Sequence, residues 1–354
     1  MLATIPILKV ARLSKPYPPL HKWVCDTQEI YKLWEWWITE GPLPDNRPKR
    51  KPLLQLDWRK IRTIPCNESA RLIDGDGSLV GLVIRDFCKE ISVLNWINGL
   101  IERAVGLKKS CRIYITMVVN FSQPNDPGKL VIVGYSPGSR SRPSFGWVRN
   151  ITRKISEGDL HDFDAQCSSA FAFFWNLARS WLPPEIIKDF DDFIGANNLP
   201  PMNRTIQTEG LDGKYTAIIN DVKYSFTDAR LAPPQGFFGG NYAAPMHKEN
   251  PPHEWAISWT TGRDPVGRHT GGQFYIAQYG IQVEHCANTL VAWKPKDVHG
   301  TGLQLYDPES GVIDFLQTGM SFSTSGRLHS EWHIVEDMLA ELAISDSSDS
   351  SDSE

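Results

Sequence analysis

The sequence predicts an α+β protein in which a small β-barrel is braced by helices. The second half of the chain carries short β-rich runs separated by Gly, Pro, Asn and Asp, the pattern of strands joined by tight turns. The first half carries longer apolar patterns with helical periodicity. Two histidines and a glutamate flank the β-rich runs, which span 255–260, 272–277, 279–283 and 289–293.

Shifts in composition divide the 354 residues into five regions. A basic, Pro-rich stretch closes the first region, and strand patterns dominate the third. The last region alternates Ser and Asp and cannot bury apolar surface, so we expect it to be disordered. The predicted regions are an N-terminal extension (1–52), a helical α/β support region (53–205), a barrel core (206–330), a C-terminal helix (331–344) and an acidic tail (345–354).

Individual elements follow from periodicity and from residues that end helices or form turns. Gly41-Pro42 and Pro183-Pro184 end two helical patterns, and Asn220-Asp221 is typical of a hairpin turn. The predicted helices are Gln28–Thr39, Ser92–Val105, Gln166–Trp181, Pro184–Ala196 and Glu331–Ile344. The predicted strands outside the four runs are Leu79–Phe87, Lys129–Tyr135, Lys214–Ile219, Val222–Phe226 and Gly319–Leu328.

Composition excludes several classes of protein. No apolar run approaches the roughly 20 residues of a membrane span, and the first residues lack the pattern of a secretory signal. We therefore expect an intracellular protein, cytoplasmic or nuclear, with no membrane partner. The net charge of −4 equals the charge of the acidic tail, so the rest of the chain is near neutral and offers no overall attraction for nucleic acid.

The six cysteines lie at positions 25, 66, 88, 111, 167 and 286, with no CxxC pair among them. Such scattered spacing favours reduced and mostly buried thiols over zinc sites or a disulfide framework.

The candidate site begins with His247-Lys248-Glu249. On a strand, side chains two residues apart point to the same side, so His247 and Glu249 can reach one ion. His299, in Lys296–Thr301, lies 50 residues beyond Glu249, which leaves room for intervening barrel strands. Two imidazoles and one carboxylate can bind one face of an octahedral metal and leave the other face open, as in non-haem Fe(II) oxygenases.

The order of motifs around these residues resembles that of the Fe(II)/2-oxoglutarate dioxygenases. Gly239–Pro245 precedes the His-x-Glu motif, and Gly271–Phe274, Tyr279-Gly280 and Leu290–Trp293 lead to the distal His299. The resemblance implies a double-stranded β-helix, a jelly-roll fold like that of cupins. It also implies Fe(II) held by His247, Glu249 and His299, with 2-oxoglutarate and O2 as co-substrates. The family more often has Asp where this chain has Glu249.

From about Gly77 onward, the chain is similar to uncharacterised proteins expanded in mushroom-forming fungi. The stretches that carry this similarity are Val80–Asp86, Gly134–Arg149, Trp255–Thr261 and Trp293–Thr301. Their barrels resemble the TET/JBP-like and prolyl-hydroxylase-like branches of the dioxygenase superfamily. In the TET-like pattern an Arg late in the last strand binds the distal carboxylate of 2-oxoglutarate, which points to Arg327. Arg263, Lys294 and Lys296 are alternatives.

Other polar residues near the motif have simpler interpretations. We expect His253, His269 and His285 in loops or on the surface. Asp297 could form an alternative Asp-x-His ligand pair with His299, or could orient a neighbour. The segment Ser136–Arg153 interleaves Arg with Phe and Trp. It could bind a phosphate backbone and stack bases, or its Arg residues could pair with acidic side chains.

The sequence therefore predicts an Fe(II)- and 2-oxoglutarate-dependent dioxygenase that hydroxylates an unidentified substrate, which could be a protein, a nucleobase or a small molecule. An alternative is a catalytically inactive barrel that binds protein or nucleic acid. A third interpretation is a cupin-like metalloenzyme that uses no 2-oxoglutarate.

Overall fold

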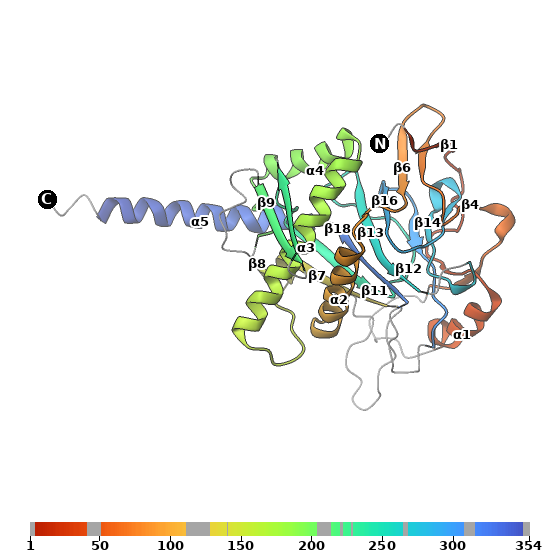
Figure 1. Cartoon of the computed structure of the whole chain (residues 1–354), viewed down its shortest axis with the longest axis horizontal. Coiled ribbons are helices and arrows are strands. Elements are labelled where there is room, and N and C mark those ends of the chain that lie inside the picture. The colour runs from red at the N-terminus through yellow and green to blue at the C-terminus, as the bar shows by residue number, and fades with distance from the viewer. Residues whose placement is uncertain are drawn as a thin grey trace.

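The computed structural model describes residues 4–40, 51–110, 128–139, 141–203, 214–219, 222–227, 229–264, 268–307 and 316–349. Its helices are α1 (Gln28–Thr39), α2 (Ile91–Leu107), α3 (Glu157–Trp181), α4 (Pro184–Ala196) and α5 (Leu328–Asp349). Figure 1 shows a body of facing β-sheets with α2, α3 and α4 on one side, and α5 projecting away from it. No helix in these ranges is long and apolar enough to cross a membrane.

The largest sheet has nine strands in the order β1-β5-β6-β16-β13-β18-β11-β7-β8. Their bounds are β1 (Ile7–Lys9), β5 (Ala70–Ile73), β6 (Leu79–Ile84), β16 (Thr289–Trp293), β13 (Ala256–Arg263), β18 (Gln317–Phe322), β11 (Gln235–Gly240), β7 (Lys129–Ser139) and β8 (Arg142–Trp147). Strands from the predicted support region thus extend both sides of the sheet that contains the barrel strands. The hairpin of β9 (Lys214–Ile219) and β10 (Val222–Thr227) forms a separate antiparallel pair.

The second sheet has five strands in the order β12-β17-β14-β15-β4. They are β12 (Ala244–His247), β17 (His299–Thr301), β14 (Phe274–Ile276), β15 (Ile281–Val283) and β4 (Arg62–Ile64). Counted along the chain, β11 to β18 place four strands in each sheet, and all their mutual pairings are antiparallel. This is the eight-stranded jelly roll, or double-stranded β-helix, so the predicted fold class is confirmed.

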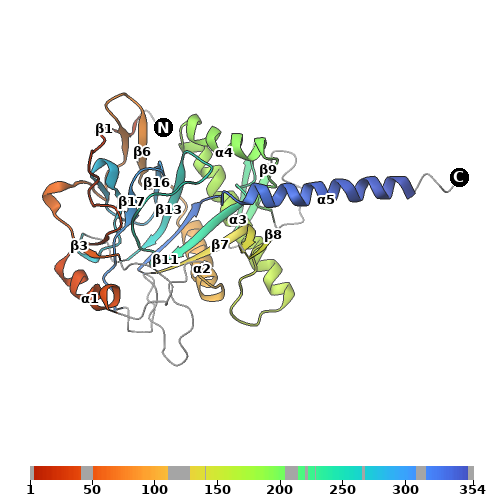
Figure 2. The ribbon, with the colours of Figure 1, turned by 180° about the vertical axis from the view of Figure 1, so that it is seen from behind.

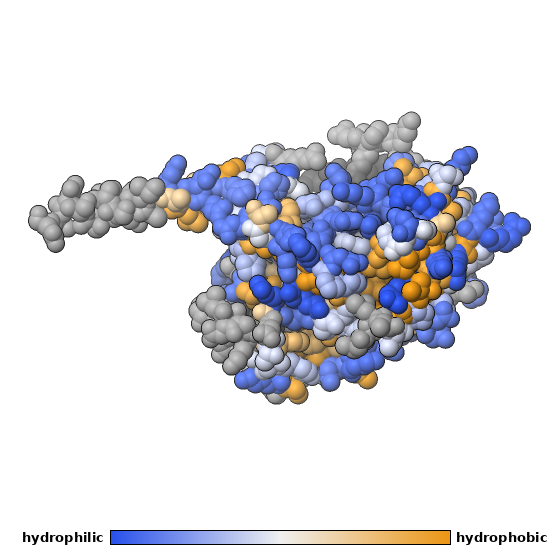
Figure 3. Space-filling view, turned by 90° about the horizontal axis from the view of Figure 1, so that it is seen from above, coloured by the Kyte–Doolittle hydropathy of each residue, from blue (hydrophilic) through white to orange (hydrophobic). Residues whose placement is uncertain are grey.

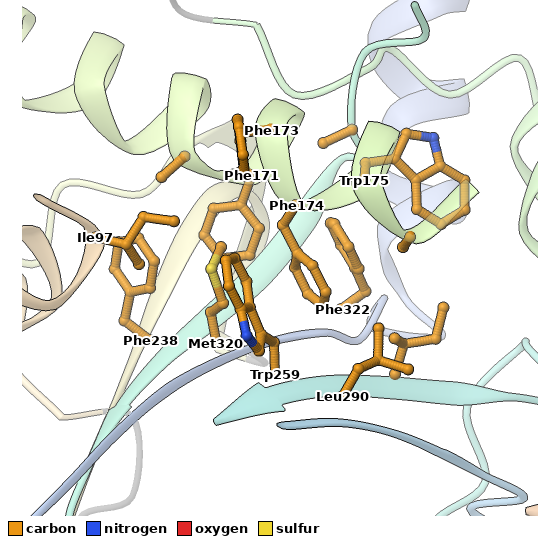
Figure 4. Close-up of a cluster of buried hydrophobic side chains, with 14 of the residues drawn as sticks. Ile97, Phe171, Phe173, Phe174, Trp175, Phe238, Trp259, Leu290, Met320 and Phe322 are labelled. Carbon is orange, nitrogen blue, oxygen red and sulfur yellow. The ribbon is translucent and has the colours of Figure 1, made fainter. Parts of the chain in front are cut away.

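An aromatic core fixes the large sheet against the helices. Phe171, Phe174 and Trp175 of α3 are buried, and Figure 4 shows them packed over side chains of the sheet. Phe173 of the same helix is also buried and packs on Phe226 of β10. Phe174 stacks on Phe322 at 4.8 Å between ring centroids. Burying such side chains contributes about 2 to 3 kcal/mol each, which anchors the sheet in place. A smaller apolar cluster fills the space between the two sheets.

The N-terminal segment runs along the outside of the five-stranded sheet, and Figure 2 shows α1 and β3 on that side of the molecule. β2 (Trp23–Cys25) pairs with β3 (Leu53–Gln55). Asp26 follows β2 and is 1% exposed, and it accepts hydrogen bonds from Tyr275 and Gln282. Burial raises the pKa of Asp26 to about 7, and the hydrogen bond from Tyr275 offsets part of that rise.

The helix predictions are confirmed, with α1 and α4 found at the predicted residues. α5 extends to Asp349, so the first half of the tail predicted to be disordered is helical; residues 350–354 lie outside the described residues. β18 ends at Phe322, before the predicted end at Leu328, because 323–327 turn into α5.

Figure 3 shows a mostly hydrophilic surface from above, with hydrophobic residues gathered on the side away from the projecting end of α5.

The prediction that all cysteines are reduced is wrong for one pair. Cys66 and Cys286 form a disulfide across 220 residues of sequence. The parallel pairing of β4 with β15 brings the residues that follow both strands together, which local spacing could not reveal. Cys25, Cys88 and Cys167 are free and buried as predicted, and Cys111 lies outside the described residues.

Replacing Asp26 with Asn should change how stability depends on pH. A carboxyl group whose pKa is higher in the folded state stabilises that state below its unfolded pKa of about 4, and this contribution is lost as the pH rises through about 7. Asn retains an acceptor for Tyr275 and cannot ionise. Asp26→Asn should therefore be the more stable protein at pH 8, by at most about 4 kcal/mol, and urea unfolding at pH 5 and pH 8 measures the difference. If the free energies of unfolding of Asp26→Asn and the natural protein differed by the same amount at both pH values, the prediction would be wrong.

The disulfide should contribute strongly to stability because it closes a very long loop. The loop-entropy model gives roughly 5 kcal/mol as an upper estimate. Reductant should lower the urea midpoint of the natural protein. The double variant Cys66→Ser, Cys286→Ser should have the same urea midpoint with and without reductant. Identical curves for the natural protein in both conditions would show that the bond does not form.

Candidate metal centre

The pairing of β12 with β17 brings the two predicted histidine ligands together. His247 ends β12, and His299 begins β17 directly opposite it in the antiparallel register. Their ring centroids are 4.4 Å apart. Gly300 allows this close pairing, because a Cβ there would lie 2.3 Å from the side chain of Met246 and 2.9 Å from the carbonyl oxygen of Ala244.

Glu249 completes the group from just beyond β12. Its backbone N–H donates to the carbonyl of Pro295 at 2.8 Å, which fixes it beside the turn that leads to His299. The His247 Nε2 and Glu249 Oε1 atoms are 3.3 Å apart. Ligand atoms of His247, Glu249 and His299, the metal triad, all lie within 4.8 Å of one another, and no other such group occurs among the described residues.

Both imidazoles are oriented for metal binding. His247 Nδ1 lies 2.7 Å from the carbonyl of Pro245, and His299 Nδ1 lies 2.9 Å from the carbonyl of Asp297. A carbonyl can only accept, so each Nδ1 carries a proton. This leaves Nε2 of each imidazole as the atom that could bind a metal, and at His247 the metal would then lie between Nε2 and Glu249. Burial, and to a lesser extent the nearby His247, lower the pKa of His299 to about 4. His299 is therefore neutral near pH 7.

The metal triad lies at one side of a cavity between the two sheets, whose empty volume is about 980 Å³ when the open solvent at its mouth is included. Aromatic side chains surround the buried ligand: the Trp293 ring is 5.5 Å from that of His299, and the Phe274 ring is 6.2 Å from it. The facing sheet contributes small hydroxyl groups, since Ser258 and Ser321 are cross-strand partners. No Lys or Arg is found among the described residues that line this cavity.

Arg327 is not brought to the cavity. Its guanidinium donates to the carbonyls of Pro137 and Gly138 in β7 and pairs with Glu331 at 3.2 Å. It therefore connects the start of α5 to β7. Lys294, one of the alternatives, pairs with Glu254 at 2.7 Å.

The alternative ligand pair of Asp297 and His299 does not form. The Asp297 carboxylate binds Arg12 at 2.5 Å, and only its backbone carbonyl contacts His299. Asp297 thus orients the imidazole through its main chain, and its side chain ties the N-terminal segment to this turn.

Two of the three other histidines, His253 and His285, lie in loops as predicted, and both are buried. His253 stacks on Phe190 with ring centroids 4.2 Å apart, while His269 is exposed. His285 follows β15 and lines the cavity. Sequence reasoning missed it because no ligand-type residue lies two positions away; its place directly after a fully buried strand was the available signal.

The Arg-rich segment 136–153 is largely committed to internal contacts. Phe145 stacks on Tyr135 and contacts Trp332 of α5, and Trp147 also packs on Tyr135. Arg149 pairs with Glu157 at 2.9 Å. These contacts favour the interpretation of this segment as a packed hairpin; Arg140 lies outside the described residues.

Comparison with known proteins gives structural likeness without sequence likeness. No family model matches the chain, and no curated protein matches it either. Among solved structures, NgTET1 in complex with 5mC DNA aligns over 85% of this chain and 88% of its own, with a TM-score of 0.43 and 10% identity. OsALKBH1 aligns over 69% of this chain and 96% of its own, with a TM-score of 0.30 and 10% identity. The fold assignment rests on the strand order and register described above.

Removing a triad ligand should weaken metal binding without unfolding the barrel. His299→Ala should lower the affinity for Mn(II), a redox-stable substitute for Fe(II), by at least about tenfold, because a divalent ion then loses one of three protein ligands. His269→Ala is the matched control, since this histidine is exposed. Equilibrium dialysis with metal analysis measures both variants. Equal metal content in the two variants would contradict the site.

Proposed function

We propose that the protein is an Fe(II)- and 2-oxoglutarate-dependent dioxygenase that hydroxylates an unidentified substrate. The observation that carries the proposal is the metal triad itself: two imidazoles and a carboxylate at the side of a cavity, with ligand atoms within 4.8 Å of one another. Three protein ligands on one face leave open positions for a chelating co-substrate and O2.

The residues fit the metal. Each histidine is held by a backbone carbonyl at its Nδ1, and Nε2 of His247 faces Glu249. The carboxylate supplies the negative charge that a divalent ion needs. When bound, Fe(II) and 2-oxoglutarate supply oxidative decarboxylation and insertion of oxygen into a C–H bond. His299 is buried while Glu249 is exposed, so the ligands run from the cavity wall toward solvent.

The cavity wall performs the remaining tasks. Trp293 and Phe274 pack beside His299 and exclude water from the buried side of the metal position. Ser258 and Ser321 offer hydroxyl groups that can orient polar atoms of a ligand by hydrogen bonds. The prediction that Arg327 binds the co-substrate stays a prediction, and its contacts with β7 and Glu331 favour a structural role.

A second candidate function is a catalytically inactive barrel that binds protein or nucleic acid. The absence of Lys and Arg from the described residues that line the cavity supports it, because the co-substrate's distal carboxylate requires a cation. Turnover of 2-oxoglutarate separates the two candidates.

Anaerobic titration with Fe(II) and then 2-oxoglutarate should produce the weak visible charge-transfer band of the chelate. His247→Ala should lose the band, because it removes a ligand, and Arg327→Gln should retain it. Admitting O2 should then convert 2-oxoglutarate to succinate in the natural protein. A protein that binds iron but gives neither the band nor succinate would favour the inactive barrel or a cupin-like enzyme.

A further inference from the structure

The turn that leads into β17 supports two of the three residues of the metal triad. The carbonyl of Pro295 accepts from the backbone N–H of Glu249 at 2.8 Å. Two residues later, the carbonyl of Asp297 accepts from His299 Nδ1 at 2.9 Å. The segment Lys294–Asp297, the ligand turn, therefore fixes the backbone of one ligand and the imidazole of another. A shift of the ligand turn would move both ligands together.

The side chain of Asp297 points away from water and depends on one cation. It is 6% exposed, and its Oδ1 accepts from an Arg12 terminal nitrogen at 2.5 Å. Its Oδ2 is buried and has no hydrogen-bond partner among the described residues. An ionised carboxylate in such a position is costly unless a positive charge compensates it. Within the described part of the chain, Arg12 is the only cation at ion-pair distance from this carboxylate.

Arg12 belongs to the N-terminal segment, and the fold holds that segment beside the ligand turn. The next residue, Leu13, donates its N–H to the carbonyl of Gln278 and accepts from the Gln278 side chain, both at 2.9 Å. The Gln278 backbone N–H donates to the carbonyl of Val298 at 3.0 Å. Arg12 also donates to the Tyr279 hydroxyl at 3.2 Å. The guanidinium is therefore held in place by its backbone neighbours and by a second side-chain contact.

We propose that Arg12 is a positioning residue of the metal triad: its ion pair with Asp297 holds the ligand turn where the two ligands need it. Without this cation, the buried carboxylate moves toward water to be solvated, and the ligand turn moves with it. The main-chain contacts with His299 and Glu249 are then lost or lengthened. The inference rests on the proposed function. It makes part of the segment predicted as an N-terminal extension a support of the metal centre.

The affinity for Mn(II) tests this role. Arg12→Gln should bind Mn(II) about tenfold more weakly than the natural protein, the lower end of the range for groups that orient a metal ligand. Arg12→Lys keeps a cation for the single carboxylate oxygen, so its affinity should lie within about twofold of the natural value. Arg71→Gln is the matched control, because Arg71 also binds the N-terminal segment, at the carbonyl of Ile5. Its affinity, measured by the same equilibrium dialysis, should be that of the natural protein.

The double variant Arg12→Gln, Asp297→Asn separates positioning by charge from a general loss of stability. It leaves no buried carboxylate without a partner, so it should bind Mn(II) more tightly than Arg12→Gln alone. If Arg12 contributed only to overall stability, a second substitution at the same contact would not restore metal affinity.

The hydrogen bond of His299 can also be followed by NMR in the metal-free protein. The Nδ1–H proton should give a slowly exchanging downfield resonance, which is assigned by its loss in His299→Ala. Arg12→Gln should raise the exchange rate of this proton by at least about tenfold, because the ligand turn then opens more easily. Arg71→Gln should leave the exchange rate unchanged.

Three results would overturn the role of Arg12: natural Mn(II) affinity in Arg12→Gln, no recovery in Arg12→Lys, or weaker binding by the double variant than by Arg12→Gln. Failure of the proposed function is distinguishable, because the natural protein would then bind no Mn(II). In that case the exchange rate of the His299 proton decides, and equal rates in the natural protein and Arg12→Gln would overturn the inference.

Discussion

The pairing of β12 with β17 is the constraint on which the site depends. It sets His247 opposite His299, and the backbone carbonyls on either side of this pair then fix both imidazoles. Gly300 is required for the strands to approach so closely. The pairing is itself held by the rest of the jelly roll, since β17 is bonded to β14 on its other side. A metal site built from two separate segments can be precise only if its strands cannot shift in register, and burial of one face of each strand prevents such a shift.

The sequence predicted what depends on local pattern. The helices followed from apolar periodicity, and the His247/Glu249 pair followed from the two-residue period of a strand. The Cys66–Cys286 disulfide and the burial of His285 depend on contacts between distant strands, which one sequence does not show. Arg327 was misplaced relative to β18 because five polar or small residues were taken as strand, where the chain instead turns into α5.

Buried polar groups divide into those that hold the fold and those that face the cavity. Asp26 belongs to the first group: it ties the N-terminal segment to β14 through Tyr275, and its raised pKa shows the energetic cost of that burial. Arg263 lies at the boundary between the groups. Its four bonds to neutral acceptors crosslink β13, β18 and the neighbouring loops, yet none of them neutralises its charge. Asp26 acts on that charge through space, so Arg263 is linked to the first group by electrostatics and to the cavity-lining Gln317 by a hydrogen bond.

His285 is a loop residue that lines the cavity, and the residues around it hold it in position. Its backbone N–H donates to the Gln273 side chain at 2.6 Å, and the next residue, Cys286, is bonded to Cys66. The preceding Glu284 accepts from the Cys66 backbone at 3.2 Å. Three consecutive residues are thus fixed to two different parts of the fold. A loop restrained in this way would lose little entropy if a ligand entered the cavity, because its side chains are already held in place.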